Sequence, residues 1–294
     1  MADVLKIEAP CKINLRLEVL GKRPDGYHEV RLLMVAISLY DHIELERAAQ
    51  GISLSSPGLP EGPENLAWRA AALFFEATGV SGGVRIALEK RVPMAAGLGG
   101  GSSDAATVLE GLDRMYGTRL GVPRLRELGA RLGSDVPFFM GGAPPAWALG
   151  RGERICPLSR PIPEVGVALV NPRIPVSTPE VYKALGAGPL PEALTSLGPD
   201  CMDTPLPEPL WGKAGRDYLR NDLETAVFGR YPKVKEIKDR LLEAGAGAAL
   251  MSGSGSSVFG ICRDQEEARR VLERARFPAD YFLWAARTLA HAGG

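Results

Sequence analysis

Residues 92–106 are the part of this sequence whose types and spacing best suit phosphate chemistry. Gly99, Gly100 and Gly101 have no Cβ, so their backbone can adopt positive φ and approach a bulky ligand closely. From residue 105 to residue 116, apolar side chains recur at the spacing of one helical face. A glycine-rich loop that leads into a helix directs free N–H groups and the positive end of the helix dipole towards one point. The segment therefore predicts a phosphate-binding loop.

Two common phosphate motifs do not fit this loop. No P-loop consensus can be placed on it, and Ser102 occupies the position where the dinucleotide-binding consensus has its third glycine. Ser102, Ser103 and Asp104 are residue types that cap helices, and Gly117 is suited to end the helix. The alternative is a flexible turn between a strand and a helix. The strong periodicity after the glycines favours the phosphate loop.

Residues 12–19 alternate between polar and apolar side chains, which predicts a half-buried strand. The apolar face would carry Ile13, Leu15, Leu17 and Val19. Lys12 and Asn14 lie two residues apart, so they point the same way from neighbouring pleats. From this strand alone, we interpret their face as an ordinary solvated one.

A tight turn at residues 24–26 is predicted to present an aromatic ring beside a histidine. Pro-Asp-Gly combines a preset φ, an aspartate acceptor and a glycine that tolerates positive φ. Tyr27 and His28 follow the turn, and Lys22 and Arg23 precede it. One interpretation is an ordinary hairpin tip. The other is a platform for a flat polar ring such as a nucleobase, flanked by positive charge for phosphate.

Asp135 follows the end of a predicted helix and precedes the apolar residues 136–139. A lone aspartate at such a corner usually caps a helix or forms a turn. Because the residues after it must be largely buried, we expect the carboxylate to be held at the wall of a pocket. A carboxylate near a phosphate loop can position or deprotonate a hydroxyl nucleophile.

The remaining pattern alternates irregularly between strands and helices without a repeat period, which indicates an α+β fold. Further strands are expected at 29–39, 42–46, 84–88, 164–170 and 281–289. Helices are expected at 64–79, 105–116, 123–132, 178–185, 232–244 and 264–275. Loops are expected at 50–63 and 186–215, and a second glycine-rich loop at 252–260.

The composition argues against several classes of function. Of the 294 residues, 35 are basic and 35 acidic, so no global field favours nucleic acid or an anionic membrane. The four cysteines are scattered without a C-x-x-C pair, which fits a reduced cytosolic protein better than a disulfide scaffold or a zinc site. The first residues show no signal peptide, and the uncharged stretch 244–262 is too rich in glycine and serine for a membrane helix. We therefore expect a cytoplasmic protein.

These motifs together resemble those of the GHMP small-molecule kinases. The three motifs of that family are matched by residues 10–15, 93–106 and 252–260. Within the family, the residues at 12–15, 23–28 and 135–137 are most similar to the branch that phosphorylates a cytidylated sugar alcohol in the non-mevalonate route to isoprenoids. The resemblance covers nearly the whole chain and is weakest at 186–215.

The resemblance implies an α+β, GHMP kinase-like architecture of two domains. Residues 1–155 would form a ribosomal-S5-like α+β domain and residues 156–294 a ferredoxin-like α/β sandwich, with the site in the cleft between them. The chain would be an ATP-dependent kinase of a small molecule, with Mg²⁺ bridging ATP oxygens and its protein ligands left open. The resemblance does not decide whether the protein is a monomer or a homodimer.

The resemblance also implies roles for individual residues. Asp135 would be the base and Lys12 its charged partner. ATP would contact Pro93, Met94, Ala95, Ala96, Gly97, Leu98, Gly99, Gly100, Gly101, Ser102 and Ser103, with Asn65, Leu66 and Lys90 near the adenine. The acceptor would contact Asn14, Tyr27, His28, Thr178, Tyr182, Gly253, Ser254 and Gly255.

The sequence departs from the family pattern at three positions. Cys11 and Ser134 stand where the family usually has alanine, and Tyr182 stands in place of phenylalanine. Cys11 would be exposed to oxidation beside Lys12. The alternatives are another GHMP kinase, acting on mevalonate, homoserine or a sugar, and a non-catalytic sensor on the same fold. The Tyr-His pair at 27–28 argues against acceptors that offer no base to stack.

Overall fold

The two longest strands, β1 and β2, form the centre of the first of two sheets. The computed structural model describes residues 4–192 and 206–289. β1 (Val4–Lys22) and β2 (His28–Ala48) pair antiparallel, and the turn expected at 24–26 joins them. The pattern predicts two strands at 29–39 and 42–46, whereas the structure has one. Pairing with β1 continues through the residues between them, so the strand is not interrupted.

Shorter strands complete this sheet, whose order is β3-β4-β2-β1-β8. β3 (Gly51–Ser55) runs parallel to β4 (Gly83–Glu89), and β4 runs antiparallel to β2. β5 (Ala146–Leu149) pairs with β2 and with β6 (Arg154–Pro157). β8 (Arg220–Asn221) comes from far along the chain and pairs parallel with β1. The expected loop at 50–63 is therefore wrong where β3 lies, because pairing with β4 makes that segment a strand.

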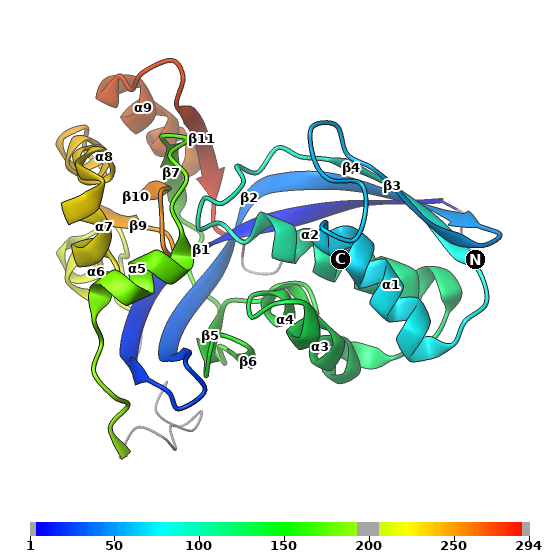
Figure 1. Ribbon diagram of the computed structural model, residues 1–294. Helices are drawn as coiled ribbons and strands as arrows, with labels where there is room; N and C mark the ends of the chain where they lie inside the picture. The colour runs from blue at the N-terminus through cyan, green and yellow to red at the C-terminus, as the bar shows by residue number, and fades with distance from the viewer. Residues whose placement is uncertain (1–3, 193–205, 290–294) are drawn as a thin grey trace.

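Four helices pack along one side of this sheet (Figure 1). They are α1 (Leu66–Thr78), α2 (Gly100–Tyr116), α3 (Gly121–Leu132) and α4 (Val136–Phe139). Asn65 caps α1, since its side-chain oxygen accepts a hydrogen bond from the Ala67 N–H at 2.9 Å. Gly79 and Gly117 end α1 and α2 in the left-handed conformation, as the sequence predicts.

The start of α2 differs from the prediction. Gly99, with φ of 69°, is the residue before the helix, and the helix begins at Gly100. Ser102, Ser103 and Asp104 therefore lie inside α2 and do not cap it. A left-handed glycine can turn the chain into the helix without a side-chain cap, which leaves the first N–H groups of α2 available to a ligand.

The second sheet is antiparallel, with the order β11-β7-β10-β9. Its strands are β7 (Gly166–Asn171), β9 (Ala248–Met251), β10 (Val258–Cys262) and β11 (Phe282–Arg287). The helices of this half are α5 (Thr178–Leu185), α6 (Lys213–Tyr218), α7 (Glu224–Arg230), α8 (Pro232–Glu243) and α9 (Gln265–Ala275). The chain order β7-α8-β9-β10-α9-β11 is the βαββαβ arrangement of ferredoxin-like folds. The predicted α+β class is confirmed.

Two sequence expectations concern the connection between the two sheets. The boundary expected after residue 155 falls inside β6. Residues 193–205 of the loop expected at 186–215 lie outside the described residues, and α6 occupies the end of that range. Within the described part of the chain, no helix has the length and apolar character that a bilayer span requires.

The core consists of two clusters of buried apolar side chains on opposite faces of β1. Cys11, Ile13 and Leu15 pack in the cluster that joins the first sheet to the second. Lys12 and Asn14 point the other way and are also buried, at 4% and 0% exposure. The expectation of a solvated face is therefore wrong, because the loop before α2 lies against that side of the strand.

A bulge in β1 changes which residues share a face. The register with β2 shifts between Asn14 and Arg16, so Leu15 has no partner on β2. An extra residue in one strand reverses the alternation beyond it. Leu17 consequently packs in the other core cluster, away from Ile13 and Leu15, and also borders the cavity described below.

Candidate functional site

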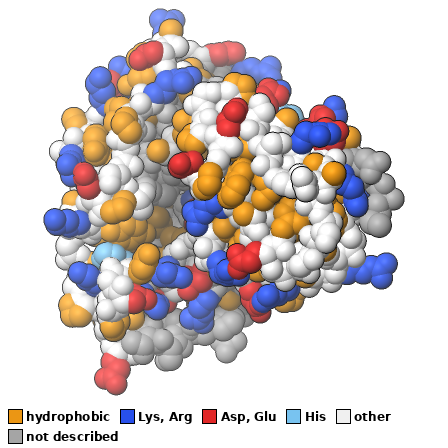
Figure 2. All heavy atoms as spheres, turned by 45° about the vertical axis from the view of Figure 1, so that its right-hand side comes forward, with side chains coloured by type: hydrophobic (Ala, Val, Ile, Leu, Met, Phe, Trp, Pro, Cys, Tyr) orange, Lys and Arg blue, Asp and Glu red, His pale blue; other side chains and the backbone are white. Residues whose placement is uncertain are grey.

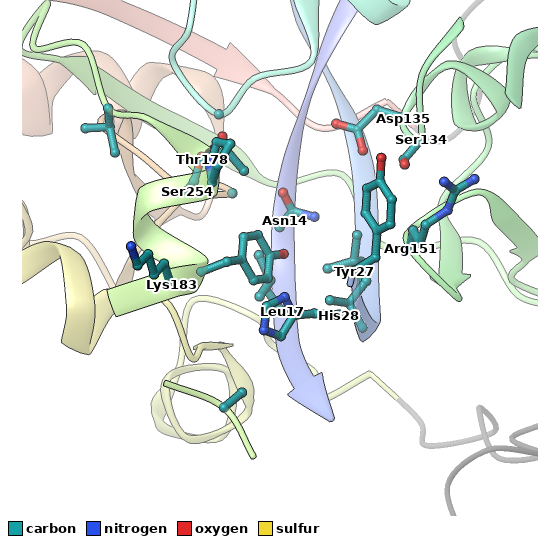
Figure 3. A pocket seen from close by; sticks show the side chains of 18 of the residues that line it. Asn14, Leu17, Tyr27, His28, Ser134, Asp135, Arg151, Thr178, Lys183 and Ser254 are labelled. Carbon is teal, nitrogen blue, oxygen red and sulfur yellow. Dashed lines mark hydrogen bonds between the residues drawn. The ribbon is translucent and has the colours of Figure 1, made fainter. Parts of the chain in front are cut away.

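A cavity of about 820 Å³ is bordered by β1, the turn at 24–28, the loop before α2, helix α5 and the loop between β9 and β10. This volume is ordinary for a small-molecule site. The residues selected from the sequence that border it are Lys12, Asn14, Tyr27, His28, Ala95, Gly97, Gly99, Asp135, Thr178, Tyr182, Gly253 and Ser254. Figure 3 shows Asp135 and Arg151 on one side of β1, and Thr178 and Lys183 on the other.

Lys12 is a buried cation whose position is fixed by three oxygen atoms. Its Nζ donates hydrogen bonds to Asn14 Oδ1 at 2.6 Å and to the Gly97 carbonyl at 3.2 Å. It also lies 3.5 Å from Asp135 Oδ2. Among the described residues, Asn14 Nδ2 has no hydrogen-bond partner. The pair of side chains therefore offers a positive charge and a spare donor to the cavity.

Asp135 stands at the residue before α4, with its side chain 30% exposed. The residues that follow it, Val136, Pro137, Phe138 and Phe139, are buried, as the sequence predicts. Burial of α4 fixes the backbone that carries the carboxylate, while the carboxylate itself borders the cavity. Asp135 can thus meet a bound hydroxyl and the Lys12 ammonium at the same time.

The two glycine-rich loops contact each other directly. The Ser252 hydroxyl donates to the Gly97 carbonyl at 2.9 Å, which is the same oxygen that accepts from Lys12. The Lys12 N–H donates to the Leu98 carbonyl at 2.9 Å. A Cβ on Gly97 would lie 2.0 Å from the Ser252 carbonyl oxygen, and φ is 74° there. A glycine is required at this point, because the two loops approach more closely than a side chain permits.

The residues expected to bind ATP do not all border the cavity. Ala95, Gly97 and Gly99 border the cavity, whereas the side chains of Ala96, Leu98 and Ser103 are buried. Met94 is 64% exposed. Of the other expected residues, Pro93 lies in the loop before α2, and Gly100, Gly101 and Ser102 lie in the first turn of that helix.

The residues expected near the adenine do not border this cavity in the described part of the chain. Leu66 and Lys90 lie beside the start of α2. Leu66 Cδ1 is 3.7 Å from the position that a Cβ on Gly101 would take, and Lys90 Nζ is 3.2 Å from the position that a Cβ on Gly100 would take. Asn65 caps α1. Gly255, expected on the acceptor side, also does not border the cavity.

Aromatic rings border the same cavity. The rings of His28 and Tyr182 stack with centroids 4.9 Å apart and 28° between their planes. Burial lowers the pKa of His28 from 6.5, with a smaller effect from the charge of Lys22, so this imidazole is neutral at pH 7. Tyr27 is 55% exposed, and the Arg151 guanidinium lies 4.8 Å from the centre of its ring. These rings can accept a flat polar ring of a ligand against them.

Sequence reasoning missed two of the cations that border the cavity. Arg151 comes from the turn after β5 and Lys183 from α5. Lys22 was noted beside the turn and does border the cavity, but Arg23 does not, because it pairs with Asp25 and Glu29. The local patterns around Arg151 and Lys183 carry no signal for such a role, since only tertiary contacts bring them to one wall.

Cys11 is not the site of oxidation that the sequence suggested. Its side chain is fully buried, and burial raises the pKa of its thiol far above the usual value. The thiolate is the reactive form of cysteine, so a buried neutral thiol is inert. Cys11 packs instead in the cluster between the two sheets.

Among the described residues, no group of three or more His, Cys, Asp or Glu side chains could hold a metal ion. Magnesium in kinases is usually held by substrate phosphates with one or two protein ligands. The side chains present therefore fit a Mg²⁺ that arrives with its nucleotide better than a resident metal centre. Figure 2 shows acidic and basic side chains interspersed over the visible face.

Comparisons with known proteins identify the family. The model of the GHMP kinases N terminal domain matches residues 65–143, and that of the GHMP kinases C terminal domain matches residues 209–279. A protein of Geobacter metallireducens named 4-diphosphocytidyl-2-C-methyl-D-erythritol kinase is 42% identical, with 97% of this chain and 99% of the relative aligned. A protein of the same name from Pelotomaculum thermopropionicum is 48% identical over 93% of this chain and 94% of its own.

Solved structures agree with this relationship. A crystal structure of 4-(cytidine 5'-diphospho)-2C-methyl-D-erythritol kinase matches with a TM-score of 0.78 and 39% identity, over 97% of this chain and 99% of that one. The mevalonate kinase of Methanococcus jannaschii shares the fold, with a TM-score of 0.70 and 16% identity over 97% and 98% of the two chains. The chain belongs to the GHMP kinases and, within them, to the family of the 4-diphosphocytidyl-2-C-methyl-D-erythritol kinases.

Proposed function

We propose that this protein transfers the γ-phosphoryl group of ATP to the 2-hydroxyl of 4-diphosphocytidyl-2-C-methyl-D-erythritol, giving the 2-phosphate and ADP in the non-mevalonate route to isoprenoid precursors. The observation that carries the proposal is the arrangement of one cavity. Lys12 and Asp135 lie 3.5 Å apart in its wall, and Tyr27, His28 and Tyr182 border the same cavity. A reacting hydroxyl and a nucleobase can therefore belong to one acceptor.

In this proposal Asp135 and Lys12 carry the chemistry. Asp135 accepts the proton of the acceptor hydroxyl as that oxygen attacks the γ-phosphorus and the bond to the ADP oxygen breaks. Lys12 neutralises charge on the phosphoryl oxygens as they pass between donor and acceptor. Its hydrogen bonds to Asn14 and Gly97 hold the ammonium in place before the reaction. The group therefore does not have to reorganise when charge develops in the transition state. Most of the remaining catalysis is positioning.

The phosphates of ATP would bind the loop of residues 93–103, at the start of α2. Its first N–H groups and the helix dipole favour anions. Leu66 and Lys90 lie beside that helix start and do not line the cavity, which suits a nucleotide bound next to the acceptor. Mg²⁺, bound by the ATP phosphates, would offset their charge.

The acceptor would lie across the cavity. Among the described residues that border it, the fully charged side chains are four cations, Lys12, Lys22, Arg151 and Lys183, and one carboxylate, Asp135. Such an excess of positive charge favours an acceptor with a diphosphate over mevalonate, homoserine or galactose. We assign the base to Tyr27, His28 and Tyr182, and the sugar alcohol to Asn14, Thr178, Gly253 and Ser254.

An ADP-release assay with four acceptors tests the proposal. We expect turnover with 4-diphosphocytidyl-2-C-methyl-D-erythritol and none with mevalonate, homoserine or galactose. Turnover with one of the other three alone would overturn the acceptor assignment. Absence of ADP release with all four, from protein that binds an ATP analogue, would favour a non-catalytic sensor.

We further propose that the chain works in the cytoplasm and divides into units at 1–155 and 156–294. The free Cys11, Cys156 and Cys262 support a reducing compartment. The N-terminal and C-terminal family matches support two units in this order. Limited proteolysis with mass spectrometry would locate the boundary, and light scattering would decide between a monomer and a homodimer.

A further inference from the structure

A cluster of one lysine and two buried aspartates lies beside the start of α2, and the mechanism above does not use the aspartates. Lys90 Nζ contacts Asp41 Oδ2 and lies 2.7 Å from Asp104 Oδ2. The residues Asp41 and Asp104 are 0% and 2% exposed. Lys90 follows β4, Asp41 belongs to β2, and Asp104 belongs to α2. Three elements distant in sequence therefore meet at one ammonium group.

This cluster holds both ends of the glycine-rich loop. At its entrance, Asp41 Oδ1 accepts hydrogen bonds from the backbone N–H groups of Arg91 and Val92, at 2.6 and 2.9 Å. At its exit, Asp104 ties α2 to Lys90. Lys90 Nζ also lies 3.2 Å from the position of a Cβ on Gly100, the first residue of α2. The loop between these anchors is thus held against one fixed charge.

The cluster carries more negative than positive charge when both aspartates are ionised. Asp41 is well satisfied by its backbone donors and Lys90, whereas Asp104 Oδ1 has no hydrogen-bond partner among the described residues. Burial raises the pKa of Asp104 to about 7; the charge of Lys90 opposes this effect and that of Asp41 adds to it. Asp104 is therefore the member of the cluster that exchanges a proton near neutral pH.

Neighbouring groups do not supply a competing titration. Burial would lower the pKa of Lys90, but the charges of Asp104 and Asp41 outweigh it and raise that pKa, so the ammonium stays charged. On β1, Lys12 and Cys11 lie near, and burial keeps Cys11 a neutral thiol. The side chains that act most strongly on the pKa of Asp104 are Lys90 and Asp41.

We propose that Asp104 is a positioning residue for the nucleotide: it holds Lys90 against the first turn of α2 and takes up a proton when phosphates bind there. The inference rests on the ATP-binding part of the proposed function. Phosphate oxygens at the start of α2 add negative charge beside an already anionic cluster, and a proton from solvent on Asp104 relieves the repulsion. Nucleotide affinity then falls as the pH rises through about 7. By linkage, bound nucleotide strengthens proton binding to Asp104 by the same factor.

Calorimetric binding of a non-hydrolysable ATP analogue with Mg²⁺, in buffers of different ionisation enthalpy, tests this inference without any acceptor. The wild type should take up more protons per bound nucleotide than Asp104→Asn, in which the amide oxygen still accepts from Lys90 but cannot titrate. Above pH 7, Asp104→Asn should bind more tightly than the wild type, by about fivefold or more. Asp104→Ala, which loses the bond to Lys90, should bind more weakly than Asp104→Asn at every pH.

Equal proton uptake by the wild type and Asp104→Asn would overturn the titration, and equal affinity of Asp104→Asn and Asp104→Ala would overturn the positioning role. Glu127→Gln is the matched control, since it removes an exposed acid on α3 that pairs with Arg124; it should behave as the wild type. Because this experiment measures nucleotide binding alone, a negative result here does not change the outcome of the ADP-release assay. If no acceptor supports ADP release, the binding experiment can still be interpreted.

Discussion

Replacing Tyr27 by alanine removes a ring that borders the cavity without belonging to the core. The side chain is 55% exposed, and one contact of its ring is with the Arg151 guanidinium at 4.8 Å. An aromatic ring that stacks on a base contributes about 1–3 kcal/mol when it is truncated to alanine. Because the ring is half exposed before any ligand arrives, we expect the lower end of that range.

The expected result is a KM for the cytidylated acceptor raised by about fivefold to tenfold, from a loss of about 1–1.5 kcal/mol. The KM for ATP should stay within about twofold of the wild-type value, because the glycine-rich loop is untouched. A coupled assay of ADP release, with each substrate varied at saturation of the other, measures both. The midpoint temperature of thermal unfolding should change little, because the side chain that is removed is exposed.

Tyr27→Phe is the matched control, because it keeps the ring and removes the hydroxyl. It should bind the acceptor nearly as well as the wild type. If Tyr27→Ala raised the two KM values equally, or if Tyr27→Phe were as impaired as Tyr27→Ala, the stacking argument would be refuted. Arg151→Ala should lie between the two variants, since it leaves the ring but removes the guanidinium packed on it.

Three further perturbations test separate parts of the site. Asp135→Asn should lower kcat by about 10²–10⁴-fold without weakening binding of an ATP analogue; a near-wild-type kcat would exclude Asp135 as the base. Gly97→Ala should lower the free energy of unfolding by more than Gly58→Ala in chemical denaturation. Both replace a glycine of positive φ, but only at Gly97 would the new Cβ meet an atom, the Ser252 carbonyl oxygen at 2.0 Å. The NMR titration of His28 should have a midpoint below 6.5, because burial lowers its pKa. The unfolded chain binds that proton more readily than the folded one, so the free energy of unfolding of the wild type should fall as the pH drops below 6.5. In His28→Gln, the free energy of unfolding should fall less over the same pH range. A His28 midpoint at or above 6.5 would contradict this.

Much of the local structure could be predicted from the sequence. Gly79 ends α1 and Gly117 ends α2 as expected, because capping depends on residue type within one turn of helix. The helix expected from residue 64 begins at Leu66, since Asn65 caps it. The errors arose where long-range pairing decides the structure. Gly51–Ser55 becomes strand β3 only because β4 lies beside it, and the region between the two predicted strands of β2 stays extended because β1 pairs across it.

The candidate site divides in the same way. The sequence by itself determined the chemical parts: a glycine-rich loop before a helix, a lysine with an asparagine two residues on, an aspartate before a buried corner, and a tyrosine beside a histidine. These are short-range patterns, so their residue types and spacing are visible without a fold. Even the start of α2 was displaced by a few residues, since Gly99 turns the chain before the capping types appear.

Only the tertiary structure decided how those parts face one another. The glycine-rich loop packed on β1 buries the face that carries Lys12, which the sequence suggested was solvated. Folding also brings Arg151 and Lys183 to the cavity wall and gathers Lys90 with Asp41 and Asp104. Distances between residues far apart in the chain follow from packing of whole elements, and local pattern does not contain them. For this protein, the sequence names the chemistry and the packing sets the distances that make it possible.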